Sequence, residues 1–255
     1  MKYVVVLGDG MADENDTYGL LWSENQYEEL AGWAMSLNMD LYQRDADGVL
    51  TITMNNERTV TSIEKVYALM NENAGSFIGK GTIADQAVLF TEDASLFLAA
   101  RMISATDASM REMESEYGIL PCPKYDESQE KYLSLIHDQA TLFVVPTSCQ
   151  DVDFSCIILE AIASESHKFV TPAYYETALK TKYVRDSISG QVIDIVHQGA
   201  TSDVAFIYAS QCGDLMNRLV GEVLRDGTNI FASKWAKIEK SATKGLERFV
   251  KAFLK

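Results

Sequence analysis

The 255-residue sequence predicts an α/β fold in which a mixed sheet is flanked by helices. Three observations lead to this prediction. Helical and extended patterns alternate along the chain without a low-complexity linker, 47% of the residues are hydrophobic, and no apolar run approaches the ~20 residues that cross a bilayer. A chain of this length forms one large domain or two modest ones.

The charge balance excludes some function classes. The chain carries 22 Lys and Arg against 37 Asp and Glu, so its formal net charge is −15. Because Lys and Arg supply most of the affinity of proteins for the phosphate backbone, we expect no nucleic-acid partner. Anionic membrane surfaces are disfavoured for the same reason, and we expect no segment that spans a membrane.

Helices are predicted where apolar residues recur at spacings of three and four. The clearest segments are 27–37 and the apolar stripe over 60–70; either Thr59 or Thr61 is expected to cap the second one, and Gly75 to close it. Gly227 is expected to end a helix over 214–225. Other helices are expected over 109–115, 153–164, 172–180, 186–197 and 233–254.

Strands are predicted for short apolar or alternating runs beside turn residues. The run 49–54 follows the turn sequence DADG and alternates like a half-buried strand. Further strands are expected over 3–7, 94–99, 118–120, 140–145 and 204–207.

The cysteines and histidines give no metal or catalytic signature. The four cysteines lack a C-x-x-C spacing, so we expect reduced or buried thiols, with Cys149 and Cys156 as the one local candidate for a bridge. The three histidines are widely separated, and a structural role is expected for each. The sequence contains no nucleophile elbow, phosphate-binding P-loop or H-E-x-x-H motif.

The acidic turn GDGMADEND at 8–16 is the most informative local feature. Asp9, Asp13 and Asp16 fall at offsets that resemble the second half of a calcium-binding loop. The residues at the first two ligand positions are Val5 and Leu7, which offer no side-chain oxygen. Two interpretations remain: a plain acidic turn, or a vestigial calcium site. We therefore expect no cofactor other than a possible calcium ion.

The first thirteen residues, MKYVVVLGDGMAD, resemble the opening of archaeal-type, cofactor-independent phosphoglycerate mutases. In that family a strand delivers an aspartate, here Asp9, to a two-metal phosphoryl-transfer site. The sequence has no Asp-His dipeptide, which the family uses among its further ligands. A metal-dependent phosphoryl-transfer enzyme is therefore the alternative function.

Over most of its length the sequence resembles the extracellular solute-binding proteins, family 1, of carbohydrate ABC importers. The resemblance starts at GDGMADENDTYGL (8–20) and continues at MREME (110–114) and YGILPCPKYDESQ (117–129). It extends through LEAIASES (159–166) and VTPAYYE (170–176). These matches are dispersed along the chain and occur in the order of the family.

The resemblance implies a type II periplasmic-binding-protein-like fold whose two lobes close on a sugar or oligosaccharide. Family members are longer, so the chain is expected to be a truncated form that lacks most of the N-terminal lobe. Residues 1–116 and 171–255 would form the C-terminal lobe, and 117–170 would return to the other lobe. The family implies a non-enzymatic protein that works with an ABC permease as a cell-surface lipoprotein, although this chain has no signal peptide.

Sugar-binding clefts stack aromatic faces on the ligand and bond its hydroxyl groups with amides and carboxylates. Four residues near the hinge-like segments are candidates for this role: Trp22, Asp107, Tyr125 and Tyr132. For the three aromatic residues, core packing is the alternative.

Overall fold

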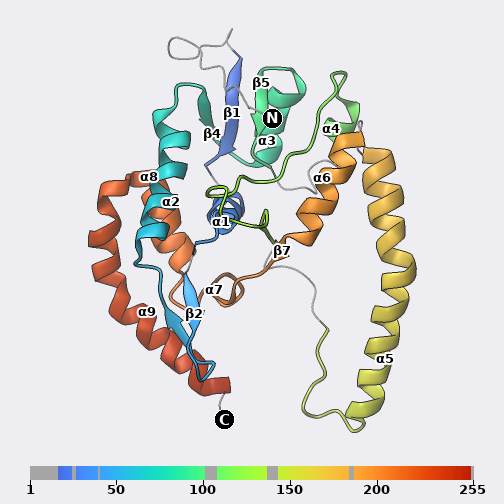
Figure 1. The fold of residues 1–255 in the computed structure, drawn as a ribbon, viewed down its shortest axis with the longest axis vertical. Helices are drawn as coiled ribbons and strands as arrows, with labels where there is room; N and C mark the ends of the chain where they lie inside the picture. The colour runs from blue at the N-terminus through green and yellow to red at the C-terminus, as the bar shows by residue number, and fades with distance from the viewer. Residues whose placement is uncertain are drawn as a thin grey trace.

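The computed structural model describes residues 17–24, 27–39, 41–100, 108–136, 143–183 and 187–253. The expected strand 3–7 lies outside these residues, as do the candidates Asp9, Asp13, Asp16 and Asp107. The described part combines helices with small open sheets, which confirms the α/β class (Figure 1).

A parallel three-stranded sheet forms one end of the molecule. Its order is β4–β1–β5, with β1 (Tyr18–Ser23) in the centre between β4 (Ser76–Gly79) and β5 (Ser95–Leu98). Helix α3 (Ile83–Thr91) connects the two outer strands. Leu21 pairs with Phe77 on one side and Leu98 on the other, and its side chain is fully buried.

Two short strand pairs complete the described sheets. Strands β2 (Tyr42–Arg44) and β3 (Leu50–Ile52) pair antiparallel, whereas β6 (Ser134–Leu135) and β7 (Ala200–Thr201) pair parallel. The sequence predicted one mixed sheet. In the described residues, parallel and antiparallel pairs instead lie in separate sheets.

Helices make up most of the remaining structure. The first ones are α1 (Tyr27–Ser36), α2 (Glu57–Tyr67) with its π-helical continuation η1 (Ala68–Glu72), and α4 (Ala108–Glu112). They are followed by α5 (Val152–Glu165), the π-helical segments η3 (Ser166–Val170) and η4 (Ala173–Tyr183), α6 (Ser187–Gln198) and α7 (Val204–Ile207). The last are η5 (Met216–Gly221), α8 (Glu222–Asp226), the 3-10 turn η6 (Thr228–Ile230) and α9 (Phe231–Phe253).

The hydrophobic core lies between the sheet and the helices α1, α2, η5, α8 and α9. Trp22 on β1, Ile63 on α2, and Leu219 on η5 are among its most buried members. Helix α9 runs along one side of the molecule (Figure 1), and five residues at helical spacing along it are buried. These residues are Phe231, Trp235, Ile238, Ala242 and Leu246, each at most 8% exposed.

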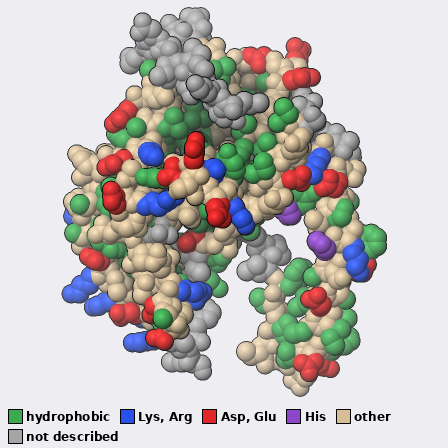
Figure 2. All heavy atoms as spheres, viewed as in Figure 1, with side chains coloured by type: hydrophobic (Ala, Val, Ile, Leu, Met, Phe, Trp, Pro, Cys, Tyr) green, Lys and Arg blue, Asp and Glu red, His purple; other side chains and the backbone are tan. Residues whose placement is uncertain are grey.

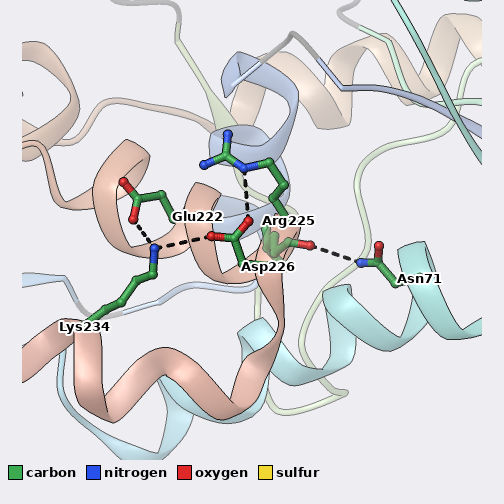
Figure 3. Close-up of polar contacts among 6 residues, drawn as sticks. Asn71, Glu222, Arg225, Asp226 and Lys234 are labelled. Atoms are coloured by element: carbon green, nitrogen blue, oxygen red, sulfur yellow. Dashed lines mark hydrogen bonds and ion pairs between the residues drawn. The ribbon is translucent and has the colours of Figure 1, made fainter.

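Polar contacts tie the start of α9 to α8, and α8 to η1 (Figure 3). The Lys234 ammonium donates to the carboxylates of Glu222 and Asp226 on α8. The Asn71 side-chain amide donates to the Leu224 carbonyl oxygen at 3.1 Å. These contacts lie on either side of Gly227, whose φ of 124° favours a glycine. Helix α8 ends just before Gly227, as expected from the sequence.

The cap of α2 corrects a prediction. Asn56 caps this helix, since its side chain accepts a hydrogen bond from the Thr59 backbone N–H at 2.9 Å. Thr59 itself is the third residue of the helix and is fully buried, and the Thr61 hydroxyl donates back to the Glu57 carbonyl oxygen. The helix therefore starts earlier than the apolar periodicity indicated.

Two expected strands are wrong. Residues 118–120 pair with no described strand, because the Ile119 backbone N–H donates to the Ser189 hydroxyl instead. The segment 204–207 is the helix α7, since the Asp203 carboxylate accepts from the Phe206 backbone N–H as an N-cap does. Of the expected strand 140–145, residues 143–145 are described and are not in a strand; 140–142 lie outside the described residues.

Helix α5 stands apart from the core. It is the long helix on the right of Figure 1, and a gap separates it from the body in Figure 2. None of its residues is buried, and Phe154 and Ile157 are 60% and 64% exposed. It connects to the body through η3 and η4, where Lys180 pairs with Asp194 of α6 at 2.6 Å.

All four cysteines are free thiols in the structure. Cys122 is half-buried, and its burial raises the pKa of the thiol to about 11. Cys149 contacts the Ser155 hydroxyl at 3.2 Å. Cys149 and Cys156, the one local candidate for a bridge, are not joined in this structure.

Candidate functional site

An open polar pocket lies where the segment 128–133 packs beside the end of α1 and the first turn of α2. Its volume is about 400 Å³, within the range of about 300–1,000 Å³ that is typical of small-molecule sites. The residues that line it are Asn38, Arg58, Ser128, Gln129, Glu130, Lys131 and Leu133. Apart from Leu133, every one of these side chains can form hydrogen bonds.

A turn at Asp126 shapes one wall of the pocket. The Asp126 carboxylate accepts hydrogen bonds from the Ser128 backbone N–H at 2.9 Å and from its hydroxyl at 2.5 Å. Asp, Ser and Asn stabilise turns in this way because their short side chains reach nearby backbone groups. The Ser128 hydroxyl bond is also the largest cause that holds the pKa of Asp126 below its ordinary value of 3.8.

Gln129 is the buried centre of this arrangement, at 8% exposure. Its amide N–H groups donate to the Ser36 and Lys131 carbonyl oxygens at 2.7 and 2.8 Å. Its carbonyl oxygen accepts from the Tyr125 backbone N–H at 3.1 Å. Because both ends of the amide are used within the protein, Gln129 supports the pocket wall, and the ligand-facing groups are its neighbours.

Arg58 reaches the pocket from the first turn of α2. Its Nε donates to the Asn38 carbonyl oxygen and its Nη2 to the Leu37 carbonyl oxygen, both at 3.1 Å. A longer contact of 3.5 Å joins Nη2 to the Gln129 side-chain oxygen. The guanidinium group is thus held in place by three neutral acceptors.

Tyr125 lies next to the pocket and is half-buried against the core. Two cations from α2 contact its ring: the Arg58 guanidinium carbon is 4.4 Å and the Lys65 ammonium 3.9 Å from the ring centroid. These cation–π contacts fasten the segment to α2. The ring of Tyr125 is therefore in contact with side chains of the protein itself, and its role in stacking on a sugar stays a prediction.

The other aromatic candidates lie in different surroundings. Trp22 is 1% exposed inside the core and packs against Trp33 at 4.8 Å between ring centroids, so core packing describes it in this structure. Tyr132 follows the pocket residue Lys131, and the Lys124 ammonium is 5.1 Å from its ring centroid. The structure brings Tyr125 and Tyr132 to the pocket region and Trp22 to the sheet.

Three pocket residues, Asn38, Arg58 and Gln129, were not predicted from the sequence. Gln129 closes the motif YGILPCPKYDESQ, so its place in the resemblance was a usable signal. Arg58 precedes the apolar stripe of α2, where a cation is ordinary, and it gave no signal. In the described part of the chain, no group of three His, Cys, Asp or Glu side chains could hold a metal ion, and no helix there is long and apolar enough to cross a membrane.

Comparison with family models, with curated proteins and with solved structures found no match for this chain.

Proposed function

We propose that this chain is the substrate-binding component of a carbohydrate ABC importer, or a part of one, and that it captures a sugar or oligosaccharide. The observation that carries the proposal is the open pocket around Arg58 and Gln129, in which six of the seven lining residues have side chains that can form hydrogen bonds. Amide, hydroxyl and charged side chains are the groups that bond sugar hydroxyls. The ordered resemblance over 8–176 supports the same function.

The uncovered helix α5 supports the two-lobe organisation that this function requires. An isolated 14-residue helix is marginal in water, so a helix of this length without one buried side chain needs a second body to pack on. The proposed type II fold assigns 117–170 to the contact with another lobe, and 1–116 and 171–255 to the C-terminal lobe. Helix α5 lies inside the first of these segments.

The remaining parts of the proposal follow from this function. The protein is not an enzyme, its partner in transport is an ABC permease, and it works outside the cell as a surface lipoprotein. The ligand lies in the cleft between the lobes, and the Arg58 pocket is the portion of that cleft contributed by the described residues.

Calorimetric titration with a panel of mono- and oligosaccharides tests the proposal. We expect saturable binding that Asn38→Gly weakens at least several-fold, because this variant removes a pocket amide. Asn38 has a φ of 53°, which glycine adopts without strain. Asp93→Gly is the matched control, since Asp93 also has a positive φ, 60°, but lies outside the pocket lining.

Two outcomes contradict the proposal. One is the absence of binding to every sugar in the panel by a folded chain. The other is manganese-dependent turnover of phosphoglycerate that Asp9→Ala abolishes, which would establish the alternative function.

A further inference from the structure

We propose that the ligand of the Arg58 pocket carries a carboxylate, as a uronic acid unit of an oligosaccharide does. This inference rests on the proposed function and names the substrate class of the same pocket. The unsatisfied charge and the unused donors of Arg58, together with Lys131 beside it, carry the argument.

Arg58 has hydrogen-bonding capacity that the described protein does not use. A guanidinium group has five N–H donors, and the bonds of Arg58 to Asn38, Leu37 and Gln129 involve only Nε and Nη2. Nη1, with two N–H groups, bonds to no described residue. Because Arg58 is half-buried, a hydrogen bond from it to an additional acceptor is stronger than the same bond made by a fully solvated arginine.

The charge of Arg58 is also incompletely balanced. Its three acceptors are neutral, and it forms no ion pair with any carboxylate in the described ranges. Asp126 is near enough to feel the charge of Arg58, but its Oδ1 already accepts two bonds from Ser128. Arg58 therefore keeps the capacity to bind an anion.

Two cations, Arg58 and Lys131, line the pocket together with one anion, Glu130. Asp126, whose turn shapes the wall, is a second anion close enough to Arg58 to feel its charge. Neither Lys131 nor Glu130 forms an ion pair among the described residues. On a chain of net charge −15, two cations that line the same pocket favour an anionic group over a neutral hydroxyl.

Arg58 is arranged in advance for such a ligand. Its carbonyl partners fix the guanidinium before any ligand binds, so little side-chain entropy is lost on binding. A planar guanidinium matches the geometry of a carboxylate better than that of a single hydroxyl. Lys131, with three donors on a flexible stem, provides a second contact to the same group.

The test compares galacturonate and glucuronate disaccharides with neutral disaccharides of the corresponding galactose and glucose. Calorimetric titration at low ionic strength is expected to show at least tenfold tighter binding of the acidic members. The preference should shrink at high salt, because exposed charges are screened.

Two variants locate the effect. Lys131→Gln and Arg58→Gln are each expected to reduce the acidic-over-neutral preference at least threefold. Lys65→Gln is the matched control, since Lys65 contacts the ring of Tyr125 but does not line the pocket. Arg58→Gln also loses the hydrogen bond to the Leu37 carbonyl oxygen at the end of α1, so urea unfolding is used to check that this variant folds. Lys131 is exposed, so Lys131→Gln is expected to fold and decides the test if Arg58→Gln does not.

Equal affinity for acidic and neutral sugars would overturn this inference and leave the proposed function standing. An acidic preference that survives both variants would likewise overturn it. The absence of binding by all of these sugars would overturn both proposals.

Discussion

The two longest described helices, α5 and α9, have opposite environments. In α9, every fourth or third residue is apolar and buried, and Ile238 is 7% exposed. In α5, Phe154, Ile157, Ile158 and Ile162 also repeat at helical spacing, yet each is at least 43% exposed. Figure 2 shows hydrophobic side chains gathered on the surface of α5.

The difference teaches that amphipathic periodicity predicts a helix and one apolar face, but not what covers that face. Helix α9 packs on β3, η5 and η6, whereas the main contact of α5 is its own continuation η3. Substitutions of the same type in both helices can measure this difference directly.

The largest effect is expected for Ala242→Lys in α9. Ala242 is 1% exposed and packs against Gly213, so a lysine there would bury an unpaired charge or open the core. We expect a loss of more than about 4 kcal/mol in the free energy of unfolding. Ala163→Lys in α5 should change it by less than about 0.5 kcal/mol, because Ala163 is exposed. Urea denaturation measures both, and equal losses would contradict the comparison.

A smaller effect is expected when one isoleucine in each helix is truncated. Ile238→Ala leaves a cavity beneath α9 and should cost about 2–5 kcal/mol. Ile157→Ala removes a side chain that is 64% exposed, so its effect should stay within about 0.5 kcal/mol. A large loss for Ile157→Ala would show that another part of the protein covers α5 in solution.

Local unfolding should be easier in α5 than in α9. Amides of α5 should exchange with deuterium faster than those of α9, because few buried contacts resist local unfolding of α5. Hydrogen-exchange mass spectrometry at neutral pH measures the two segments in one sample. Protection of α5 equal to that of α9 would contradict the difference in burial.

The smallest effect concerns the ion pairs of each helix. Hydrogen bonds from Lys234 to Glu222, and then to Asp226, raise the pKa of Lys234 above its ordinary value of 10.5. The pair therefore stabilises the fold at pH values below 10.5, and this contribution is lost as the pH rises through the higher folded pKa. Lys234→Gln should lower Tm slightly at neutral pH and make no difference at strongly alkaline pH.

Lys168→Gln, in the segment η3 that continues α5, is the matched control. Its partner Glu165 lies 2.8 Å away, but both side chains are more than half exposed, so water screens the pair. We expect no measurable change of Tm at any pH. A fall equal to that of Lys234→Gln would show that exposure does not separate the two pairs.

The sequence predicted the helices well where one face is strongly apolar. The helices expected over 153–164, 186–197 and 233–254 agree with α5, α6 and α9 to within a few residues. Short elements were harder to predict. Strand β4 and helix α3 were missed, although Thr82 and Asp85 form a capping box whose spacing was readable in the sequence.

The candidate site was less predictable than the fold. Tyr125 and Tyr132 lie near the pocket, but Arg58 and Asn38 join it from segments far away in the chain. Their approach depends on the buried amide of Gln129, which links 129 to the end of α1. A side chain whose function depends on such a long-range bond leaves no local pattern.

By itself, the sequence determined the α/β class, the helical periods and the acidic charge, because these depend on composition and on the spacing of neighbouring residues. Only the tertiary structure decided that Trp22 packs in the core, that α9 is covered and α5 is not, and that Arg58 meets Lys131 at one pocket. Burial and pocket formation are set by which distant surfaces meet, and the same local pattern is compatible with a covered or an open face.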